Sequence, residues 1–574
     1  MSTQTESIVT KLSKNRILIF SLVAILAIQN LIFQITFRLN FPYSVDFGDV
    51  FKPMFDFIVN DEFTFFINKG IHVIFFPKLI SLPNLYFNSF DVVNLTYVYW
   101  ITISLTVFVI YLIIKQTDRK LIWTIIPISA FLYSPLTVSG YWSIALLAWF
   151  FPMLSISVII YLFNKSQINS KIFSSGIFFS IFGTFSILLG VVSWIAGFLI
   201  LMKSISKKRL ENKKWIILWI SSSLITGFVY LSLISGLSQP INFDLLFSFS
   251  GFSFITNFLS SSFRLKYQTL MILVGSLSII LSIVYCWYFI KKDYFKQFFP
   301  WFVFLLTAFS GSIITALGRM HLEDHLGNEP YYSPISQIFH IGLILLTAKI
   351  LLEFRKNPQD IKKKIIIAIL ISIILSQMIL LIPSYYSGWQ RGYHYFDEKS
   401  EFVNCFSLHP EKKCLEVQLM NSDPETLSLI NYLIVNEQSI FNEKKFQKLD
   451  PFLLQKFSSY NLSKSSEKIG SILYINDQSI LNHNYELKDE IFKIDGWIQK
   501  PNYENLDKIY LSIDDELLVE YDDFQISELD NSSNLKWSLF MMSGYIPNGC
   551  NSLSIFTIIN NEKILLDSEI SICK

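Results

Sequence analysis

Residues 42–93 read PYSVDFGDVFKPMFDFIVNDEFTFFINKGIHVIFFPKLISLPNLYFNSFDVV, and the rest of the chain is interpreted from this stretch. It separates two apolar runs that are each long enough to cross a membrane. A connection of about fifty residues without a domain of its own is usually functional or disordered, and its aromatic and apolar content argues against disorder. We therefore expect amphipathic helices on the outer membrane surface, with carboxylates at the boundary between water and lipid.

Composition places the chain among polytopic membrane proteins. Of its 574 residues, 52% are hydrophobic and only 16% are charged, whereas soluble proteins have about 25% charged residues. The net charge of +2 comes without a basic stripe or an RNA-binding motif, so we expect membrane lipids as partners and no nucleic acid.

About eleven apolar runs predict transmembrane helices. The first, Ile17–Thr36, lacks the short apolar core and clear cleavage site of a signal peptide, so we expect a retained helix. The short pair on either side of Gly190 is compatible with one bent or re-entrant unit. The other runs are Leu95–Ile114, Leu121–Val138, Tyr141–Phe163, Ile172–Leu189, Val191–Met202, Trp215–Ser235, Thr269–Ile290, Phe298–Leu317, Gln337–Phe354 and Ile365–Pro383.

Lys and Arg gather in every second loop, in phase with the spans. Because basic loops stay on the cytoplasmic side, we expect a cytoplasmic N-terminus (residues 1–16) in an integral plasma-membrane protein. The loop over residues 37–94 and everything after Pro383 would then be extracytoplasmic. The basic loops hold Lys115, Arg119 and Lys120; Lys165 and Lys171; Lys203 to Lys214; Lys291, Lys292 and Lys296; and Arg355 to Lys364.

The domain boundaries follow from the change in composition near Ser384. We predict a transmembrane domain over residues 17–384, and a linker over 385–467 with a helix at Asp423–Phe441. Residues 468–574 contain short alternating runs separated by turn residues, which indicates an extracytoplasmic antiparallel β-sandwich.

Four of the five cysteines lie in the C-terminal third. If that region faces an oxidising compartment, three pairings are possible, and we favour Cys405–Cys414 with Cys550–Cys573. Cys286 lies in an apolar run and is expected to be inert.

Asp46 and Asp49 follow the first span in the sequence VDFGDVF. An i, i+3 spacing places both on one side of a helix or turn. There they can act as a general base on an acceptor hydroxyl or bind a divalent cation such as Mg or Mn. The alternatives are ordinary solvated acids or a helix N-cap at Asp46.

His72 and Lys78 lie in GIHVIFFPKLISLPN, beside an apolar surface. An imidazole and an ammonium there can stabilise a phosphate. They can equally be interfacial anchors that meet lipid headgroups.

Arg319 begins an outer loop, GRMHLEDHLGNEPYYSPIS, just as a span ends. Its guanidinium suits bidentate phosphate recognition, and the alternative is an arginine that caps the span. His321 and His325, with Glu323 and Asp324, can serve as accessory groups or share a metal. The order H-x-x-x-H lacks the glutamate of the zinc-protease motif.

Several of these stretches resemble the GT-C superfamily of membrane glycosyltransferases. The run HVIFFPKLISL is similar to an H-R-I-x-x-P-K-L run in their outer loops, and GVVSWIAGFLIL to a G-x-x-x-W-P-x-G helix. The loop after Arg319 is similar to their A-x-G-R…S-R-Y loop. INYLIVNEQSIF followed by FKIDGWI resembles their helix after the membrane and the start of their β domain.

The chain departs from these patterns at three places. Val73 replaces an arginine, Ile195 replaces a proline, and Pro330 or Tyr331 stands where a second arginine is expected. The resemblance implies an acidic catalytic residue at Asp46, with Asp49 as the alternative.

The resemblance implies an inverting transferase that moves a sugar from a polyprenyl-phosphate donor to a glycan, lipid or protein acceptor on the outer face. Arg319, with Lys78 or His72, would stabilise the departing phosphate. A second interpretation is a non-enzymatic envelope anchor that presents the β domain. A third is a lipid or polysaccharide transporter, which the scarcity of charge within the spans argues against.

Overall fold

The computed structural model describes residues 16–37, 73–87, 93–137, 147–165, 167–205, 213–233, 243–263, 265, 267–319, 327, 329–355, 379–394 and 396, and the strands given below. The chain divides into two compact units. One is a helical unit of Met1–Arg38, Asp49–Pro83 and Val93–Tyr395, and the other contains Leu39–Gly48, Asn84–Val92 and Phe396–Lys574.

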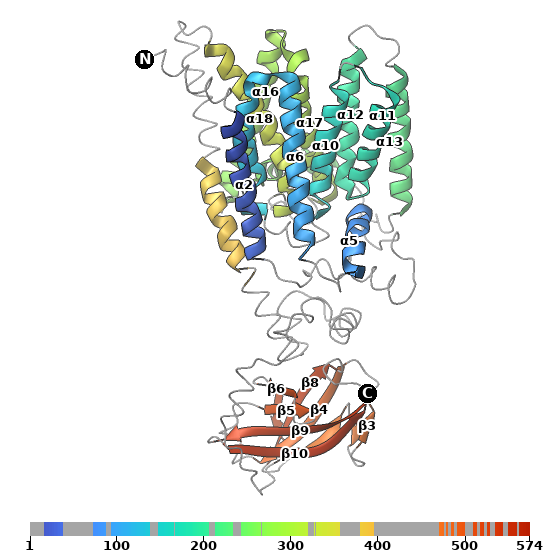
Figure 1. Ribbon diagram of the computed structural model, residues 1–574, viewed down its shortest axis with the longest axis vertical. Coiled ribbons are helices and arrows are strands. Elements are labelled where there is room, and N and C mark those ends of the chain that lie inside the picture. Colours follow the sequence, from blue (N-terminus) through green and yellow to red (C-terminus); the bar gives the residue numbers. More distant parts are fainter. Residues whose placement is uncertain are drawn as a thin grey trace. The chain divides into compact units, whose positions relative to one another are not determined.

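Six helices are long and apolar enough to cross a membrane, and each overlaps a predicted span (Figure 1). The protein is therefore a polytopic helical membrane protein. The six candidate spans are α2 (Arg16–Thr36), α6 (Leu95–Thr117), α13 (Lys213–Leu233), α16 (Gln268–Lys291), α17 (Phe295–Arg319) and α18 (Ser333–Arg355).

Shorter helices fill the helical unit between these spans. Residues 379–394 are also helical, and Trp389 packs its ring on Phe33 of α2. The shorter helices are α5 (Phe75–Phe87), η3 (Arg119–Thr124), α7 (Ile125–Leu132), η4 (Pro135–Thr137), α10 (Phe150–Phe163), α11 (Ser170–Thr184), η5 (Leu188–Val191), α12 (Val192–Ile205), α14 (Phe243–Leu246), α15 (Phe249–Ser260) and η8 (Pro330–Tyr332).

Within the described residues, six of the about eleven predicted spans are helices long enough to cross a membrane. The expected span Leu121–Val138 is a 3₁₀ turn followed by α7, which has only eight residues. Pro127 fits the first turn of α7, and Pro135 disfavours helix for the residue before it. Residues 138–146 and 356–378, which complete two other predicted spans, lie outside the described residues.

The stretch around Gly190 forms a bent pair of short helices rather than two full spans. A 3₁₀ turn, η5, joins α11 to α12. A Cβ on Gly190 would overlap the carbonyl of Gly183, so only glycine permits this close approach of the backbone. The Nζ of Lys203 donates to Oδ1 of Asn164 at 3.3 Å, which brings the last turn of α12 back beside the end of α10.

One end of the helical unit carries much of the positive charge. Lys115, Arg119, Lys120 and Lys349 line a common cavity at this end, and we call it the basic end. The helices α6 and α18 finish there, whereas α17 begins there and finishes at the opposite end.

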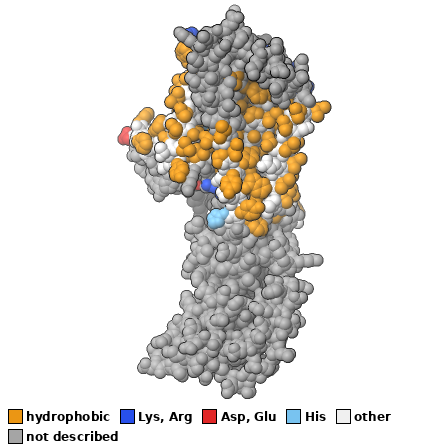
Figure 2. All heavy atoms as spheres, turned by 90° about the vertical axis from the view of Figure 1, so that its left-hand side faces the viewer, with side chains coloured by type: hydrophobic (Ala, Val, Ile, Leu, Met, Phe, Trp, Pro, Cys, Tyr) orange, Lys and Arg blue, Asp and Glu red, His pale blue; other side chains and the backbone are white. Residues whose placement is uncertain are grey.

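The sides of the helices present apolar residues. On α2, Ile17 is 81% exposed, and Leu224 and Phe228 of α13 are 68% and 75% exposed. Figure 2 shows such side chains covering a band of the helical unit with few charged groups among them. Exposed apolar area on this scale is what a lipid-facing surface requires.

The described strands of the second unit pair into two five-stranded sheets, in the orders β2-β1-β4-β8-β7 and β3-β10-β9-β5-β6. The pairing is antiparallel except between β10 and β3, which are parallel. The strands are β1 (Gly470–Ile475), β2 (Gln478–Ser479), β3 (Asn484–Glu486), β4 (Ile491–Gln499), β5 (Ile509–Ile513), β6 (Leu517–Tyr521), β7 (Gln525–Glu528), β8 (Asn534–Met542), β9 (Cys550–Ile559) and β10 (Glu562–Cys573).

The hairpin of β9 and β10 is closed by the predicted Cys550–Cys573 disulfide. The two cysteines are opposite each other in the register of the hairpin. Cys405–Cys414 and the predicted helix Asp423–Phe441 lie outside the described residues.

Candidate functional sites at the two ends of the helical unit

Most of the predicted site residues lie outside the part of the chain that the structure describes. Only Lys78 and Arg319 can be placed, and both lie away from the basic end. The predicted residues outside the described ranges are Asp46, Asp49, His72, His321, Glu323, Asp324 and His325.

Arg319 is the last residue of α17, and its side chain contacts an aromatic residue of η8. Its Nη1 donates a hydrogen bond to the hydroxyl of Tyr331 at 3.0 Å. Its Cζ lies 5.7 Å from the centre of the same ring, within the range of a cation–π contact. These contacts hold the guanidinium at the end of a span, where charge meets the membrane surface.

Three aromatic rings support that arginine. Tyr331 lies 4.6 Å from the ring of Tyr332 and 5.1 Å from that of Trp149, which directly precedes α10. Tyr332 is fully buried and also packs on Phe258 of α15. Three separate parts of the chain thus fix the ring on which Arg319 lies.

The two tyrosines remain neutral at ordinary pH. Burial raises the pKa of Tyr331, although the neighbouring Arg319 charge partly opposes this effect. Burial also raises the pKa of Tyr332. The Tyr331 hydroxyl is therefore a stable acceptor for Arg319.

Lys78 lies in α5 with only 1% of its surface exposed. The backbone N–H of Phe75 donates to Phe185 at 2.8 Å, and that of Val73 donates to the Tyr230 hydroxyl, so α5 is tied to the end of α11 and to α13. A buried ammonium is tolerated only where polar or anionic groups compensate it. This favours a specific role for Lys78 over that of an interfacial anchor, which would reach water.

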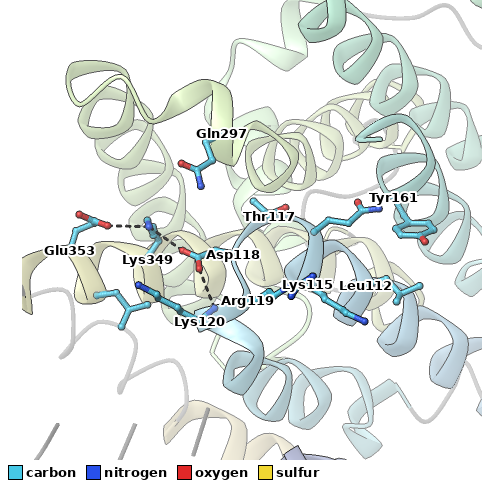
Figure 3. Close-up of a pocket in the computed structure, with 12 residues that line it drawn as sticks. Leu112, Lys115, Thr117, Asp118, Arg119, Lys120, Tyr161, Gln297, Lys349 and Glu353 are labelled. Atoms are coloured by element: carbon cyan, nitrogen blue, oxygen red, sulfur yellow. Dashed lines mark hydrogen bonds and ion pairs between the residues drawn. The ribbon is translucent and has the colours of Figure 1, made fainter. Parts of the chain in front are cut away.

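The other site is a cavity of about 750 Å³ at the basic end. At its rim the Lys349 Nζ lies 3.0 Å from Oδ2 of Asp118 and 3.0 Å from Oε1 of Glu353 (Figure 3). These three side chains are only 11–15% exposed. Gln297 of α17 lines the same cavity. Since Arg319 ends the same helix and each residue adds about 1.5 Å, the distance from Gln297 to Arg319 along α17 is about 33 Å.

Sequence reasoning missed this cavity, although it noted some of its members. In the sequence, Lys115, Arg119 and Lys120 indicate only the orientation of the chain. Asp118 gives the missing signal, because it is a lone acid within the basic run KQTDRK. The carboxylate of such an acid can form an ion pair with a buried cation that lies elsewhere in the chain and requires a partner.

No family model, curated protein or solved structure matches this chain. The fold therefore defines its class by itself: a polytopic helical membrane protein with six candidate spans. Within the residues described, no three His, Cys, Asp or Glu side chains gather as a metal site would require. The expected Mg or Mn dependence stays a prediction, because its candidate ligands lie outside those ranges.

Proposed function

We propose that the protein is a membrane glycosyltransferase that uses a polyprenyl-phosphate-linked sugar as donor. The observation that carries this proposal is the arginine fixed on an aromatic cluster at the end opposite to the basic end. If the basic end is cytoplasmic, Arg319 and Lys78 lie at the outer face. A lipid-anchored phosphate is presented at this depth of a membrane, with its tail between the helices.

The chemistry assigned to these residues is stabilisation of the leaving group. An acceptor hydroxyl attacks the anomeric carbon, and the bond from that carbon to the phosphate oxygen breaks with both electrons going to the oxygen. Arg319 and Lys78 compensate the charge that develops on the phosphate. The general base that takes the acceptor proton is Asp46, with Asp49 as the alternative; this role rests on the sequence resemblance alone.

We also infer that the two sheets of the second unit pack as an extracytoplasmic β-sandwich. The disulfide between Cys550 and Cys573 supports this location, because such bonds persist in oxidising compartments. In this scheme the domain binds the glycan, lipid or protein acceptor.

The test is turnover of a donor by the full-length protein in lipid nanodiscs. Short-chain polyprenyl-phosphate hexoses are supplied, and release of polyprenyl phosphate is followed by chromatography. Arg319→Gln is expected to lower the rate by about 10²–10³-fold, as does loss of an oxyanion donor. Arg319→Lys should keep part of the rate because it keeps the charge but loses the bidentate geometry.

Asp46→Asn should abolish transfer and leave membrane insertion unchanged. Lys213→Gln is the matched control, because it removes an exposed charge from the basic side of the chain. The proposal is wrong if none of the hexose donors is turned over by the parent protein. The assignment of Arg319 is wrong if the parent protein is active and Arg319→Gln retains that activity.

A further inference from the structure

The cavity at the basic end is not used by the proposed transfer reaction. It is formed where α6 runs into η3 and where α17 and α18 pass beside them. Polar groups also face it: Gln116, Thr117 and Gln297, with Tyr161 of α10, lie in its wall together with the charged residues (Figure 3). A volume of about 750 Å³ falls in the range of small-molecule sites.

Three cationic side chains in its lining are available to a ligand. Lys115, Arg119 and Lys120 are exposed, and among the described residues no carboxylate forms an ion pair with any of them. They follow one another at the end of α6 and in η3, so their positions are set by one stretch of backbone. That backbone is itself fixed, because Asp118 accepts a hydrogen bond from the Lys120 N–H at 3.1 Å.

The two carboxylates in the wall do not cancel these charges. Both Asp118 and Glu353 direct an oxygen to the Lys349 ammonium at 3.0 Å. Four cationic side chains against two carboxylates leave a surplus of two positive charges in the lining. The ion pairs also hold α18 against η3, which keeps the cavity wall in place without a ligand.

We propose that this cavity binds a phosphate-bearing group. Arg119 offers a planar fork of N–H donors that matches phosphate oxygens, and Lys115 and Lys120 add point charges. The cavity is much larger than a phosphate ion, and Leu112 and Leu352 line it beside the charged groups. The ligand is therefore an anionic lipid headgroup at the membrane edge or a soluble phosphorylated molecule, both of which present the same phosphate chemistry.

The test uses the full-length protein and two defined probes. Inorganic phosphate is titrated into protein held in phosphatidylcholine nanodiscs, and in a second series the nanodiscs contain increasing phosphatidylglycerol. The midpoint of thermal unfolding reports binding, because a ligand of the native state raises it. The parent chain is compared with the cavity variant Lys115→Gln, Arg119→Gln, Lys120→Gln.

The control variant Lys171→Gln, Lys213→Gln, Lys292→Gln removes the same number of exposed charges outside the cavity. We expect stabilisation by at least one probe, an affinity about 100-fold weaker in the cavity variant, and an unchanged affinity in the control. Stabilisation by phosphatidylglycerol alone identifies a lipid headgroup, and stabilisation by phosphate alone identifies a soluble ligand.

Two results would overturn the proposal. One is that neither probe stabilises the parent chain. The other is that both triple variants lose affinity equally, because the effect would then come from the overall charge of the basic end. If the cavity variant fails to fold, Arg119→Lys tests the same point by weakening binding without loss of charge.

Discussion

At the scale of single residues, the ion pairs of Lys349 show how this membrane protein tolerates buried charge. Its ammonium lies between Asp118, which is 231 positions away in the chain, and Glu353, one helical turn further along α18. It also lies 4.6 Å from the ring centre of Phe298 in α17. A single cation thus connects α17, α18 and η3 at the basic end.

Lys349→Met is therefore expected to destabilise the native state by about 3 kcal/mol. The change removes two charge-assisted hydrogen bonds and leaves two largely buried carboxylates without their cation. Lys120→Met is the matched control, since Lys120 is exposed and Asp118 contacts only its backbone N–H. Thermal unfolding in detergent measures both variants. Equal melting temperatures for the two would show that the ion pairs contribute little.

The same residues show why the sequence predicts only part of the candidate sites. A separation of 231 positions cannot be bridged by any local pattern, so the pairing of Lys349 with Asp118 is visible only in the fold. The position of Arg319, two residues after an apolar run, is visible in the sequence. Its partner Tyr331 stands in the sequence only as a departure from an expected arginine, whereas in the fold its hydroxyl accepts the hydrogen bond from Arg319.

At the scale of elements, long apolar runs predict spans well and short ones poorly. Six runs became helices of 21–25 residues, because a run of about twenty apolar residues in a membrane has few alternatives to a helix. Leu121–Val138 is equally apolar, but its two prolines limit the helix to eight residues. Apolar composition sets burial in the membrane, whereas proline and glycine decide where a helix ends.

The turn between α11 and α12 makes this point testable. Gly190→Ala is expected to cost about 1–3 kcal/mol or more, because the new methyl group overlaps the Gly183 backbone, which cannot rotate away. Gly227→Ala is the control, since a Cβ there meets nothing within 4 Å, and in a helix it should stabilise by up to about 1 kcal/mol. The difference in melting temperature between the two variants measures the effect. A similar change in both would mean that the close contact at Gly190 is relieved by movement of the turn.

At the scale of the whole molecule, orientation in the membrane determines which end would meet the polyprenyl donor of the proposed reaction. Positive residues of alternate loops meet at one end of the helical unit. Lys203 donates a hydrogen bond to Asn164, which is the neighbour of Lys165. The cationic residues of one cavity at this end are Lys115, Arg119, Lys120 and Lys349. The fold therefore collects these charges at one end, and from the positive-inside rule we expect that end in the cytoplasm.

Cysteine labelling in intact cells tests that assignment directly. Lys213→Cys marks the start of α13 at the basic side, and Phe247→Cys marks a residue that is 88% exposed in the connection from α13 to α16. A membrane-impermeant maleimide should add label above the parent chain to Phe247→Cys in intact cells, and to Lys213→Cys only after permeabilisation. The parent chain corrects for its five native cysteines. The reverse pattern would place Arg319 in the cytoplasm, where the donor phosphate would have to lie in the inner leaflet and the cavity at Lys115 would face the outside.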